Sequence, residues 1–355
     1  MARSFVSVLI DTYNHERFIE QAIESALEQD FPNSEREIIV VDDGSTDRTP
    51  EIVKKFEPRV RLLRKENGGQ ASAFNAGIPE CKGEIVAFLD GDDWWAPGKL
   101  TAVAGALAGD TSIGLVGHGI TEVFPDGSEH VQLLKETPRF RMDSETGARA
   151  FRLRKSFLGT SRMTIRAAAL RQIGGVPEAL TIQADEYLFT LAGFLSEVLI
   201  LRESLTFYRL HAGNAFQVAG GNRQALRRKQ NVLEALAKSL TAKLGEQEVN
   251  ERVARIAVES IETEAELIRL SLDAGLPWET VRTEVRNYRI MHPDASLPHW
   301  FFKGLALLPS CVMPSRNYYS LRERVSQNRV YRKAREKWLP FLQHAHVDRF
   351  WTTKL

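Results

Sequence analysis

Residues 37–45 read Glu-Ile-Ile-Val-Val-Asp-Asp-Gly-Ser, a short apolar run that ends in two acids, a glycine and a serine. A continuous run of β-branched residues is typical of a strand that is covered on both faces, as in a parallel sheet. Similar runs occupy residues 5–10, 60–63 and 84–89, and segments with helical spacing lie between them. This alternation predicts an α/β fold in which crossover helices connect parallel strands.

The pattern changes twice after the first hundred residues. Shorter segments follow, and we expect strands at residues 160–165, 198–201 and 205–208 that extend the parallel core into a mixed sheet. Further on, the chain becomes rich in Ala, Leu, Glu, Arg and Lys with helical spacing. We therefore expect one α/β domain over residues 1–220 and a helical C-terminal region over residues 221–355.

The composition is that of a globular chain without extreme charge. The 355 residues include 47 Lys and Arg against 46 Asp and Glu, which gives a formal net charge of +1. A nucleic-acid partner is therefore not expected. The two cysteines, Cys81 and Cys311, belong to no zinc-binding or disulfide pattern. No signal peptide and no apolar run of membrane-spanning length is apparent, so we expect a cytoplasmic protein.

Polar and acidic clusters follow three of the expected strands, at residues 11–14, 42–45 and 90–93. Ligands of open α/β sheets bind outside the carboxyl ends of the strands, so these clusters are expected to converge. Each cluster could also serve only as a helix cap or turn. Three carboxylates between residues 90 and 93, however, repel one another unless a cation compensates them. Mg²⁺ and Mn²⁺ prefer carboxylate oxygens, so we interpret this edge as the site of a metal-bound diphosphate.

Taken in order, these clusters resemble the family 2 glycosyltransferases of the GT-A fold. The resemblance rests on Asp-Thr-Tyr-Asn at 11–14, Val-Asp-Asp-Gly-Ser-x-Asp at 41–47, Asn-Gly-Gly to Asn-Ala-Gly at 67–77, and Phe-Leu-Asp-Gly-Asp-Asp-x-Trp at 88–95. It covers roughly residues 4–215. It implies a Rossmann-like mixed sheet flanked by helices. It also implies an inverting transferase that moves a sugar from a nucleotide-sugar donor, expected to be a UDP-sugar, to a hydroxyl group of a glycan, polysaccharide or lipid-linked acceptor.

The resemblance also implies a role for single residues. The residues expected to bind the donor are Thr12, Tyr13, Asn14, Asp43, Gly69, Asn75, Asp90 and Gly91. Asp92 is expected to contact Mn²⁺ or Mg²⁺, and His211 is expected to lie near the metal or the diphosphate. Asp185 matches the general base that removes the proton of the acceptor hydroxyl, and its neighbour Glu186 is a rival for that role.

Three positions depart from the family pattern, and two other functions stay open. Asp11 stands where a small residue or proline is common, Phe74 where a basic residue often precedes the asparagine, and Ala184 where an acid is frequent. The alternatives are a non-catalytic protein that binds nucleotide sugars as a scaffold, and a nucleotidyltransferase. Release of nucleoside diphosphate indicates glycosyl transfer, whereas pyrophosphate indicates nucleotidyl transfer.

The C-terminal region carries a signal of its own. Residues 299–308 are aromatic and apolar, and the stretch from Arg316 to Lys337 has eight basic residues against two acids. Apolar aromatic residues beside a basic cluster suit a membrane interface. Two interpretations stay open: a core-packed helix with a solvated basic face, which we place first, and peripheral contact with the inner face of a membrane through residues 297–337.

Overall fold

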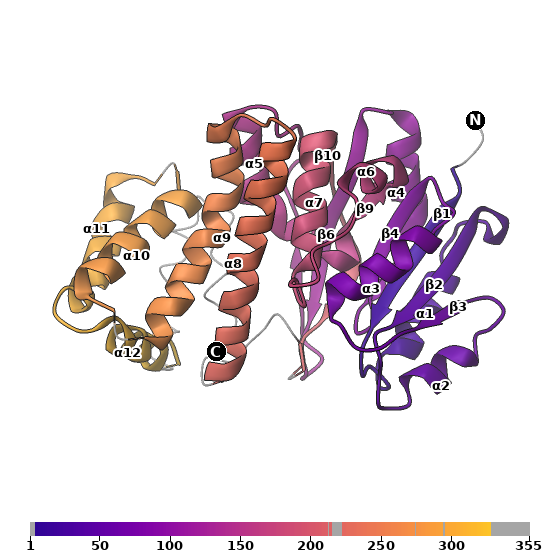
Figure 1. The fold of residues 1–355 in the computed structure, drawn as a ribbon, viewed down its shortest axis with the longest axis horizontal. Coiled ribbons are helices and arrows are strands. Elements are labelled where there is room, and N and C mark those ends of the chain that lie inside the picture. Colours follow the sequence, from indigo (N-terminus) through magenta and orange to yellow (C-terminus); the bar gives the residue numbers. More distant parts are fainter. Residues whose placement is uncertain (1–3, 212, 215–221, 274, 294, 328–355) are drawn as a thin grey trace. The chain divides into compact units, whose positions relative to one another are not determined.

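The computed structural model describes residues 4–211, 213–214, 222–273, 275–293 and 295–327 (Figure 1). The chain divides into two compact units, Met1–Asn214 with Ala242–Ala257, and Ala215–Thr241 with Val258–Leu355. The boundary that composition places near residue 220 stays a prediction about domain organisation.

The first unit is built on a ten-stranded sheet with the order β3-β2-β1-β4-β9-β6-β10-β5, while β7 pairs with β6 and β8 with β10. In chain order the strands are β1 (Val6–Thr12), β2 (Arg36–Asp42), β3 (Arg61–Arg64), β4 (Ile85–Asp90), β5 (Trp94–Trp95), β6 (Ile113–Val123), β7 (Glu129–Gln132), β8 (Arg139–Phe140), β9 (Thr164–Arg166) and β10 (Glu197–Arg209). Strands β1 to β4 are parallel, and β9 joins them to the parallel pair β6 and β10 by antiparallel pairing. The predicted mixed α/β sheet is confirmed.

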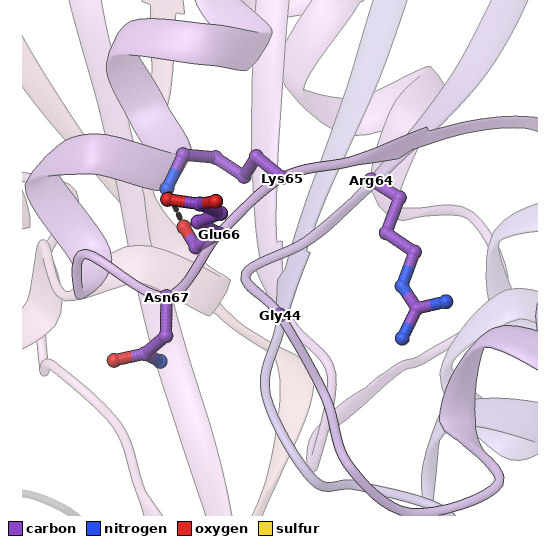
Figure 2. A pocket seen from close by; sticks show the side chains of 5 residues that line it. All are labelled: Gly44, Arg64, Lys65, Glu66 and Asn67. Atoms are coloured by element: carbon purple, nitrogen blue, oxygen red, sulfur yellow. Dashed lines mark hydrogen bonds between the residues drawn. The ribbon is translucent and has the colours of Figure 1, made fainter.

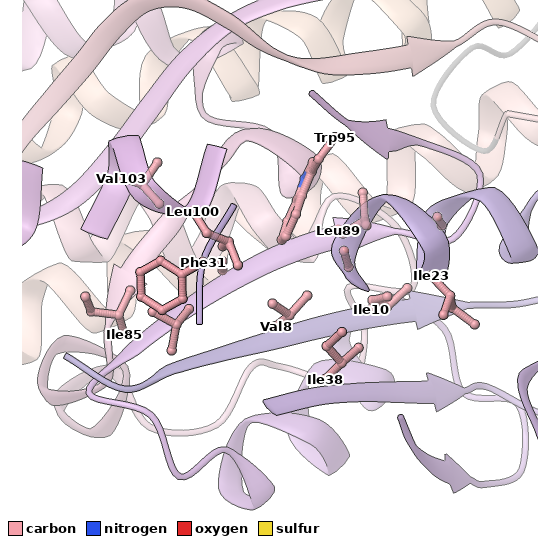
Figure 3. Close-up of a cluster of buried hydrophobic side chains, with 14 of the residues drawn as sticks. Val8, Ile10, Ile23, Phe31, Ile38, Ile85, Leu89, Trp95, Leu100 and Val103 are labelled. Atoms are coloured by element: carbon pink, nitrogen blue, oxygen red, sulfur yellow. The ribbon is translucent and has the colours of Figure 1, made fainter. Parts of the chain in front are cut away.

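Helices cover both faces of this sheet. They are α1 (Ile19–Leu27), α2 (Thr49–Lys54), α3 (Gln70–Gly77), α4 (Lys99–Gly109), α5 (Glu145–Arg154), α6 (Ala167–Ile173) and α7 (Ala184–Leu195). Alternate residues of β1, such as Val8 and Ile10, pack against Ile23 of α1 and Leu100 of α4 in one buried cluster (Figure 3). Burial of each such side chain contributes about 1.5–3 kcal/mol to the stability of the fold. Because side chains alternate along a strand, it also fixes which residues face the opposite side of the sheet.

Helix α3 packs against the opposite face of β1 and β2. A Cβ added at Gly77 would lie 2.5 Å from a methyl group of Leu9 and 2.7 Å from one of Val41, so this helix approaches the sheet closely. Phe74 is fully buried and packs edge-on against Phe88 of β4, with ring centroids 5.4 Å apart. The basic residue that the family often has before the asparagine is thus replaced by a core side chain.

Two segments differ from the prediction. The strands expected at residues 198–201 and 205–208 form one strand, β10, because shifts in register at Leu201/Ser204 and Ser204/Phe207 carry the pairing with β6 through the polar residues between them. The strand expected at 160–165 begins as a short 3-10 turn, Thr160–Arg162, and only then enters β9. That turn directs the polar groups of Thr160 and Ser161 toward the acidic edge of the sheet.

The C-terminal region is helical, as predicted, in the part that the structure describes. Its helices are α8 (Arg223–Glu246), α9 (Glu251–Leu272), α10 (Pro277–Met291), α11 (Leu297–Leu307) and α12 (Ser315–Gln327). A small core in the second unit contains Leu267, Leu270 and Leu307 with two tyrosines of α12. Among the described residues, no helix combines the length and apolar character that crossing a bilayer would need.

Candidate active site

The acidic clusters meet at the carboxyl edge of the parallel strands. Asp11 of β1 and Asp90 of β4 are Cα partners in the register, and the Gly91 N–H donates a hydrogen bond of 2.9 Å to the Asp11 carbonyl. Burial, followed by the charge of Asp92, raises the pKa of Asp11 to about 8. Burial and the charges of Asp11 and Asp92 raise the pKa of Asp90 well above its ordinary value. Negative charge gathered in this way would be stabilised by a cation.

Asp93 has a structural role in the same loop. It is almost fully buried, and its carboxylate accepts hydrogen bonds from the Ser161 hydroxyl at 2.6 Å and from the Arg209 N–H at 2.9 Å. Burial and the charge of Asp92 raise its pKa to about 8. Asp93 thus joins the loop after β4 to the turn before β9 and to the end of β10.

Two imidazoles flank the carboxylate of Asp92. The Nε2 atom of His211 lies 3.0 Å from Asp92 Oδ2, and the Nε2 atom of His15 lies 3.8 Å from the same oxygen. Burial acts to raise the pKa of Asp92, but the hydrogen bond from His211 and the charges of both histidines outweigh it, and the net shift is downward. Burial, more than any charge, lowers the pKa of His15.

These side chains have the chemistry that a divalent cation needs. Within the described residues, no three His, Cys, Asp or Glu side chains form a complete cation site. Asp92 offers an ionised oxygen, the histidines offer ring nitrogens, and the Asp11 Oδ1 atom is buried without a hydrogen-bond partner. Because Mg²⁺ commonly takes only one or two carboxylates and shares substrate phosphates, an incomplete protein site of this kind fits such an ion.

Glycine at position 91 is required by close packing beside this site. A Cβ atom there would approach Thr12 Oγ1 to 2.6 Å and His15 Nδ1 to 2.9 Å. Thr12 Oγ1 itself lies 3.2 Å from His15 Nδ1. The glycine thus leaves room for the pair Thr12 and His15 next to Asp92.

Asp185 lies in the first turn of helix α7 and contacts Thr160 at the same edge. Its Oδ2 atom accepts hydrogen bonds from the Thr160 N–H at 3.0 Å and the Thr160 hydroxyl at 3.2 Å, and its Oδ1 accepts one from the Glu186 N–H. Burial, only partly offset by these bonds, raises the pKa of Asp185. A carboxylate with a raised pKa is a better proton acceptor, which is what a general base needs.

The neighbouring acid, Glu186, has a different environment. It is buried, forms an ion pair with Lys155, and accepts a hydrogen bond from Gln183 at 3.4 Å. Which of the two acids acts as a base stays a prediction.

Gln70, which the motifs did not single out, connects the two halves of the edge. Its Nε2 atom donates to Asp90 at 3.4 Å and to the Thr160 hydroxyl at 3.1 Å, and its Oε1 accepts from the Ala184 N–H at 2.9 Å. Since Thr160 in turn donates to Asp185, one chain of hydrogen bonds runs from Asp90 to Asp185.

The carboxylate of Asp43 organises the loop after β3. It accepts hydrogen bonds from Lys65 Nζ at 2.7 Å, from Asn67, and from the N–H groups of Gly68 and Gly69, the last at 2.7 Å. Gly69 has a φ of +85°, and its backbone passes close to Thr181. A Cβ atom added at position 69 would lie 2.6 Å from the Cα of Thr181. The loop is thereby fixed at the start of α3.

An open pocket of about 580 Å³ lies beside this loop (Figure 2). Its lining residues are Gly44, Arg64, Lys65, Glu66 and Asn67. Tyr13, in the loop after β1, is 44% exposed.

Two expected donor-binding residues have their side chains engaged elsewhere. Asn14 accepts a hydrogen bond from the Thr46 N–H at 2.8 Å. Asn75 donates to the Val176 carbonyl at 2.8 Å and to Glu178 at 2.9 Å. Within the part of the chain that the structure describes, neither side chain forms a hydrogen bond to the acids at positions 11 and 90–93, so a donor-binding role for Asn14 and Asn75 stays a prediction.

Arg209 is another residue that the motifs left unassigned. Its Nε atom donates to the Asp92 carbonyl at 2.9 Å, and its guanidinium lies over the rings of Trp94 and Phe18, at 4.4 Å and 4.8 Å from their centroids. The sequence offered only one sign of this role, the position of Arg209 two residues before His211.

Comparison with known proteins agrees with this geometry. Residues 7–174 match the family model of "Glycosyl transferase family 2". The matched segment, slightly less than half of the chain, is similar to family 2 glycosyltransferases. An uncharacterized glycosyltransferase of Nostoc sp. is 31% identical over 216 residues, which are 59% of this chain and 66% of that protein. The chain thus spans slightly less than two thirds of this glycosyltransferase relative.

Two proteins of known structure are also similar. The poly(ribitol-phosphate) β-N-acetylglucosaminyltransferase TarS of Staphylococcus aureus is 40% identical over 92 residues, 25% of this chain and 16% of TarS. The structure of TarS 1–349 with UDP-GlcNAc has a TM-score of 0.53 at 19% identity and covers 86% of this chain and 90% of that chain. The mannosyltransferase PcManGT of Pyrobaculum calidifontis, in complex with GDP-Man and Mn²⁺, has a TM-score of 0.54 at 18% identity, with coverage of 97% and 89%. Both similarities confirm the glycosyltransferase fold.

Proposed function

We propose that the protein transfers a sugar from a nucleotide-sugar donor to a hydroxyl acceptor and inverts the anomeric carbon. The observation that carries the proposal is the hydrogen-bonded chain from Asp90 through Gln70 and Thr160 to Asp185. It connects the acids expected at the donor diphosphate with the half-buried carboxylate of Asp185, in the first turn of another helix. Such a connection fixes the distance between a leaving group and a base. Catalysis by proximity and orientation requires this distance to be fixed.

The donor diphosphate is assigned to the Asp92 edge. Asp92 would hold Mn²⁺ or Mg²⁺, with His211 beside the ion or the diphosphate, and the bound ion would neutralise the charge of the departing nucleoside diphosphate. Arg209 supports this arrangement, since it fixes the Asp92 carbonyl while its guanidinium is held between two aromatic rings.

The nucleoside is assigned to the neighbouring loops. The exposed ring of Tyr13 offers a stacking surface, and the pocket at Arg64, Lys65 and Asn67 lies beside the loop that Asp43 organises. We propose a UDP-sugar as the donor, which is the kind of donor that TarS binds. A GDP-sugar, the kind of donor in the PcManGT complex, is the alternative that the same screen tests.

Asp185 is proposed as the general base. It takes the proton of the acceptor hydroxyl, whose oxygen then attacks the anomeric carbon as the nucleoside diphosphate leaves. A single displacement without a protein nucleophile inverts the configuration. The raised pKa of Asp185 and the ion pair that occupies Glu186 both support this assignment.

The acceptor is proposed to be a glycan, polysaccharide or lipid-linked precursor at the inner face of a membrane. Helix α11 and the turn after it expose several large apolar side chains in the described part of the chain: Leu297, Phe301, Phe302, Leu305, Leu308 and Val312. Arg316, which is exposed, begins the basic stretch, and the basic residues from Arg329 to Lys337 lie outside the described residues. Apolar aromatic residues followed by basic ones suit an anionic bilayer surface.

A donor screen tests the function. The melting temperature of the full chain is measured with Mn²⁺ and a panel of nucleotides, because a ligand that binds only the folded state raises it. UDP and UDP-sugars should give the largest increase, and turnover with an acceptor mixture should release UDP. Release of pyrophosphate would instead show nucleotidyl transfer, and donor binding without turnover of any acceptor would favour a scaffold.

A further inference from the structure

Lys99 is a basic side chain in the protein interior. It is the first residue of α4, and it is 0% exposed. Its Nζ atom donates a hydrogen bond of 2.8 Å to the Ser161 carbonyl and lies 3.8 Å from the centroid of the Trp95 ring. Burial lowers the pKa of Lys99 well below its ordinary value. Burying an amino group costs free energy unless it finds a hydrogen-bond partner, and the Ser161 carbonyl supplies that partner.

The Ser161 carbonyl is held by three side chains. Besides Lys99, Trp95 Nε1 donates to it at 3.0 Å and the Thr206 hydroxyl donates at 2.6 Å. A carbonyl oxygen has two lone pairs, so three donors occupy it fully. Trp95 and Thr206 are Cα partners in the pairing of β5 with β10, whereas Lys99 comes from a helix. Lys99 is therefore the donor that connects this carbonyl to α4.

The turn that contains this carbonyl contacts acids on both sides of the proposed reaction. The Ser161 hydroxyl donates to Asp93 at 2.6 Å and accepts from the Asp90 N–H at 3.0 Å. The Thr160 N–H and hydroxyl donate to Asp185 Oδ2 at 3.0 Å and 3.2 Å. The groups that bind the donor-side acids and the proposed base thus lie on two consecutive residues. Displacement of the Ser161 carbonyl would move both sets of contacts.

We propose that Lys99 is a positioning residue of the reaction, which holds the Ser161 carbonyl and thereby fixes the hydrogen bonds from Thr160 that orient Asp185. The proposal rests on the proposed function, because it concerns the same base. A residue that orients a base affects turnover more than substrate affinity, since the orientation matters in the transition state.

The proposal also predicts a change in pH dependence. The hydrogen bonds from Thr160 lower the pKa of Asp185 and so oppose the larger effect of burial. If the turn is no longer held, these bonds weaken and the pKa of Asp185 rises. A base must be deprotonated to act, so the acidic limb of the turnover profile should then move to higher pH.

Steady-state kinetics of the full chain across this pH range test the proposal. Lys99→Met removes the donor and keeps a long side chain, while Thr206→Val removes another donor of the same carbonyl without changing charge. We expect kcat of Lys99→Met to fall roughly 10- to 100-fold, with the donor KM within roughly twofold of the parent. Thr206→Val should show a smaller fall, and both variants should shift the acidic limb upward. The matched control is Lys54→Met, at an exposed position of α2.

The outcomes separate this inference from the proposed function. If the parent releases no nucleoside diphosphate with any acceptor, the proposed function fails and the inference with it. If the parent is active and Lys99→Met keeps its kcat, or loses kcat without a shift of the acidic limb, only the inference is overturned. A shift in Lys99→Met that Thr206→Val lacks would assign the effect to the lost charge and overturn it as well. Should Lys99→Met not fold, as judged by circular dichroism, Thr206→Val decides: a shifted limb supports the proposal and an unshifted limb overturns it.

Discussion

Asp11 and Asp90 stand opposite each other on the parallel strands β1 and β4, at the end of the sheet where the strands stop. Both are half-buried, and the pKa of each is raised by burial and by neighbouring carboxylates. Asp11 occupies a position where the family commonly has a small residue or proline, so this chain carries an additional acidic group at the donor edge. That group has consequences for stability and for ion binding.

The first consequence concerns pH. The pKa of Asp11 is about 8 in the folded protein against an ordinary value of 3.8. Between these values the folded state holds the proton and the unfolded state releases it, so stability falls as pH rises. Asp11→Asn removes this loss, and we expect it to raise the metal-free melting temperature by a few degrees more at pH 8 than at pH 5. The matched control is Glu51→Gln at an exposed position of α2. Equal effects of Asp11→Asn at both pH values would contradict the assignment.

The second consequence concerns the ion. Asp92→Ala removes the carboxylate that faces both imidazoles. UDP affinity measured by calorimetry with Mn²⁺ should fall strongly, because the ion normally offsets repulsion between acids and phosphate. In buffer with chelator the parent and the variant should bind UDP similarly weakly. An Asp92→Ala variant with the parent's Mn²⁺-dependent affinity would exclude the metal assignment.

The second unit contains a buried charge cluster that makes a separate prediction. Glu284 is 1% exposed and accepts hydrogen bonds from Lys303 and Arg322, each at 2.7 Å, and from the Tyr319 hydroxyl. Lys303 is 15% exposed and Arg322 is 34% exposed, and removing the acid takes away the buried carboxylate that they share. Breaking a buried ion pair typically costs about 3–5 kcal/mol. We expect Glu284→Ala to lower the free energy of unfolding by that amount in urea titrations.

An exposed ion pair provides the control for this prediction. Glu262 lies 3.3 Å from Arg286, and both side chains are about half exposed. Glu262→Ala should therefore change the free energy of unfolding by less than about 1 kcal/mol. Similar effects of the two substitutions would show that the Glu284 cluster does not stabilise the unit.

The exposed apolar residues of α11 predict adsorption to anionic bilayers. The full chain should sediment with vesicles of phosphatidylglycerol and phosphatidylcholine more than with phosphatidylcholine alone, and salt should weaken this binding. Phe301→Ser with Phe302→Ser should reduce it, because both rings are more than half exposed and contribute little to the folded core. If equal fractions of the protein sediment with both kinds of vesicle at low salt, membrane contact is excluded and the solvated basic face is the correct interpretation.

The sequence predicted the regular part of the fold well, because strands covered on both faces leave an unbroken apolar run. It failed where tertiary contacts override local pattern. The polar residues Arg202 and Glu203 interrupt the apolar pattern, yet β10 continues through them by shifts in its register with β6. Thr160 and Ser161 resemble strand residues, but their side chains bind acids from other segments and hold the chain in a turn.

The candidate site was predictable only where a motif marks it. Asp92, Asp185 and His211 come from recognisable patterns. Gln70 and His15 do not, because their roles arise from segments that are distant in sequence and meet only in the folded chain. Similarly, the motif predicts that Asp43 binds the donor, and the structure engages its carboxylate with the loop at residues 65–69.

We propose Asp185 as the base of a glycosyl transfer at this edge. Asp185→Asn keeps the size of the side chain and should leave Mn²⁺-dependent UDP affinity unchanged, while Glu186→Gln serves as the matched neighbour.

The decisive measurement is the rate of UDP release from the donor that the screen identifies, with saturating acceptor, for the parent and both variants. We expect the turnover of Asp185→Asn to fall on the order of 10²- to 10⁴-fold, the range of general base catalysis. Glu186→Gln should retain most of the activity. Normal turnover by Asp185→Asn, or a comparable loss confined to Glu186→Gln, would contradict it.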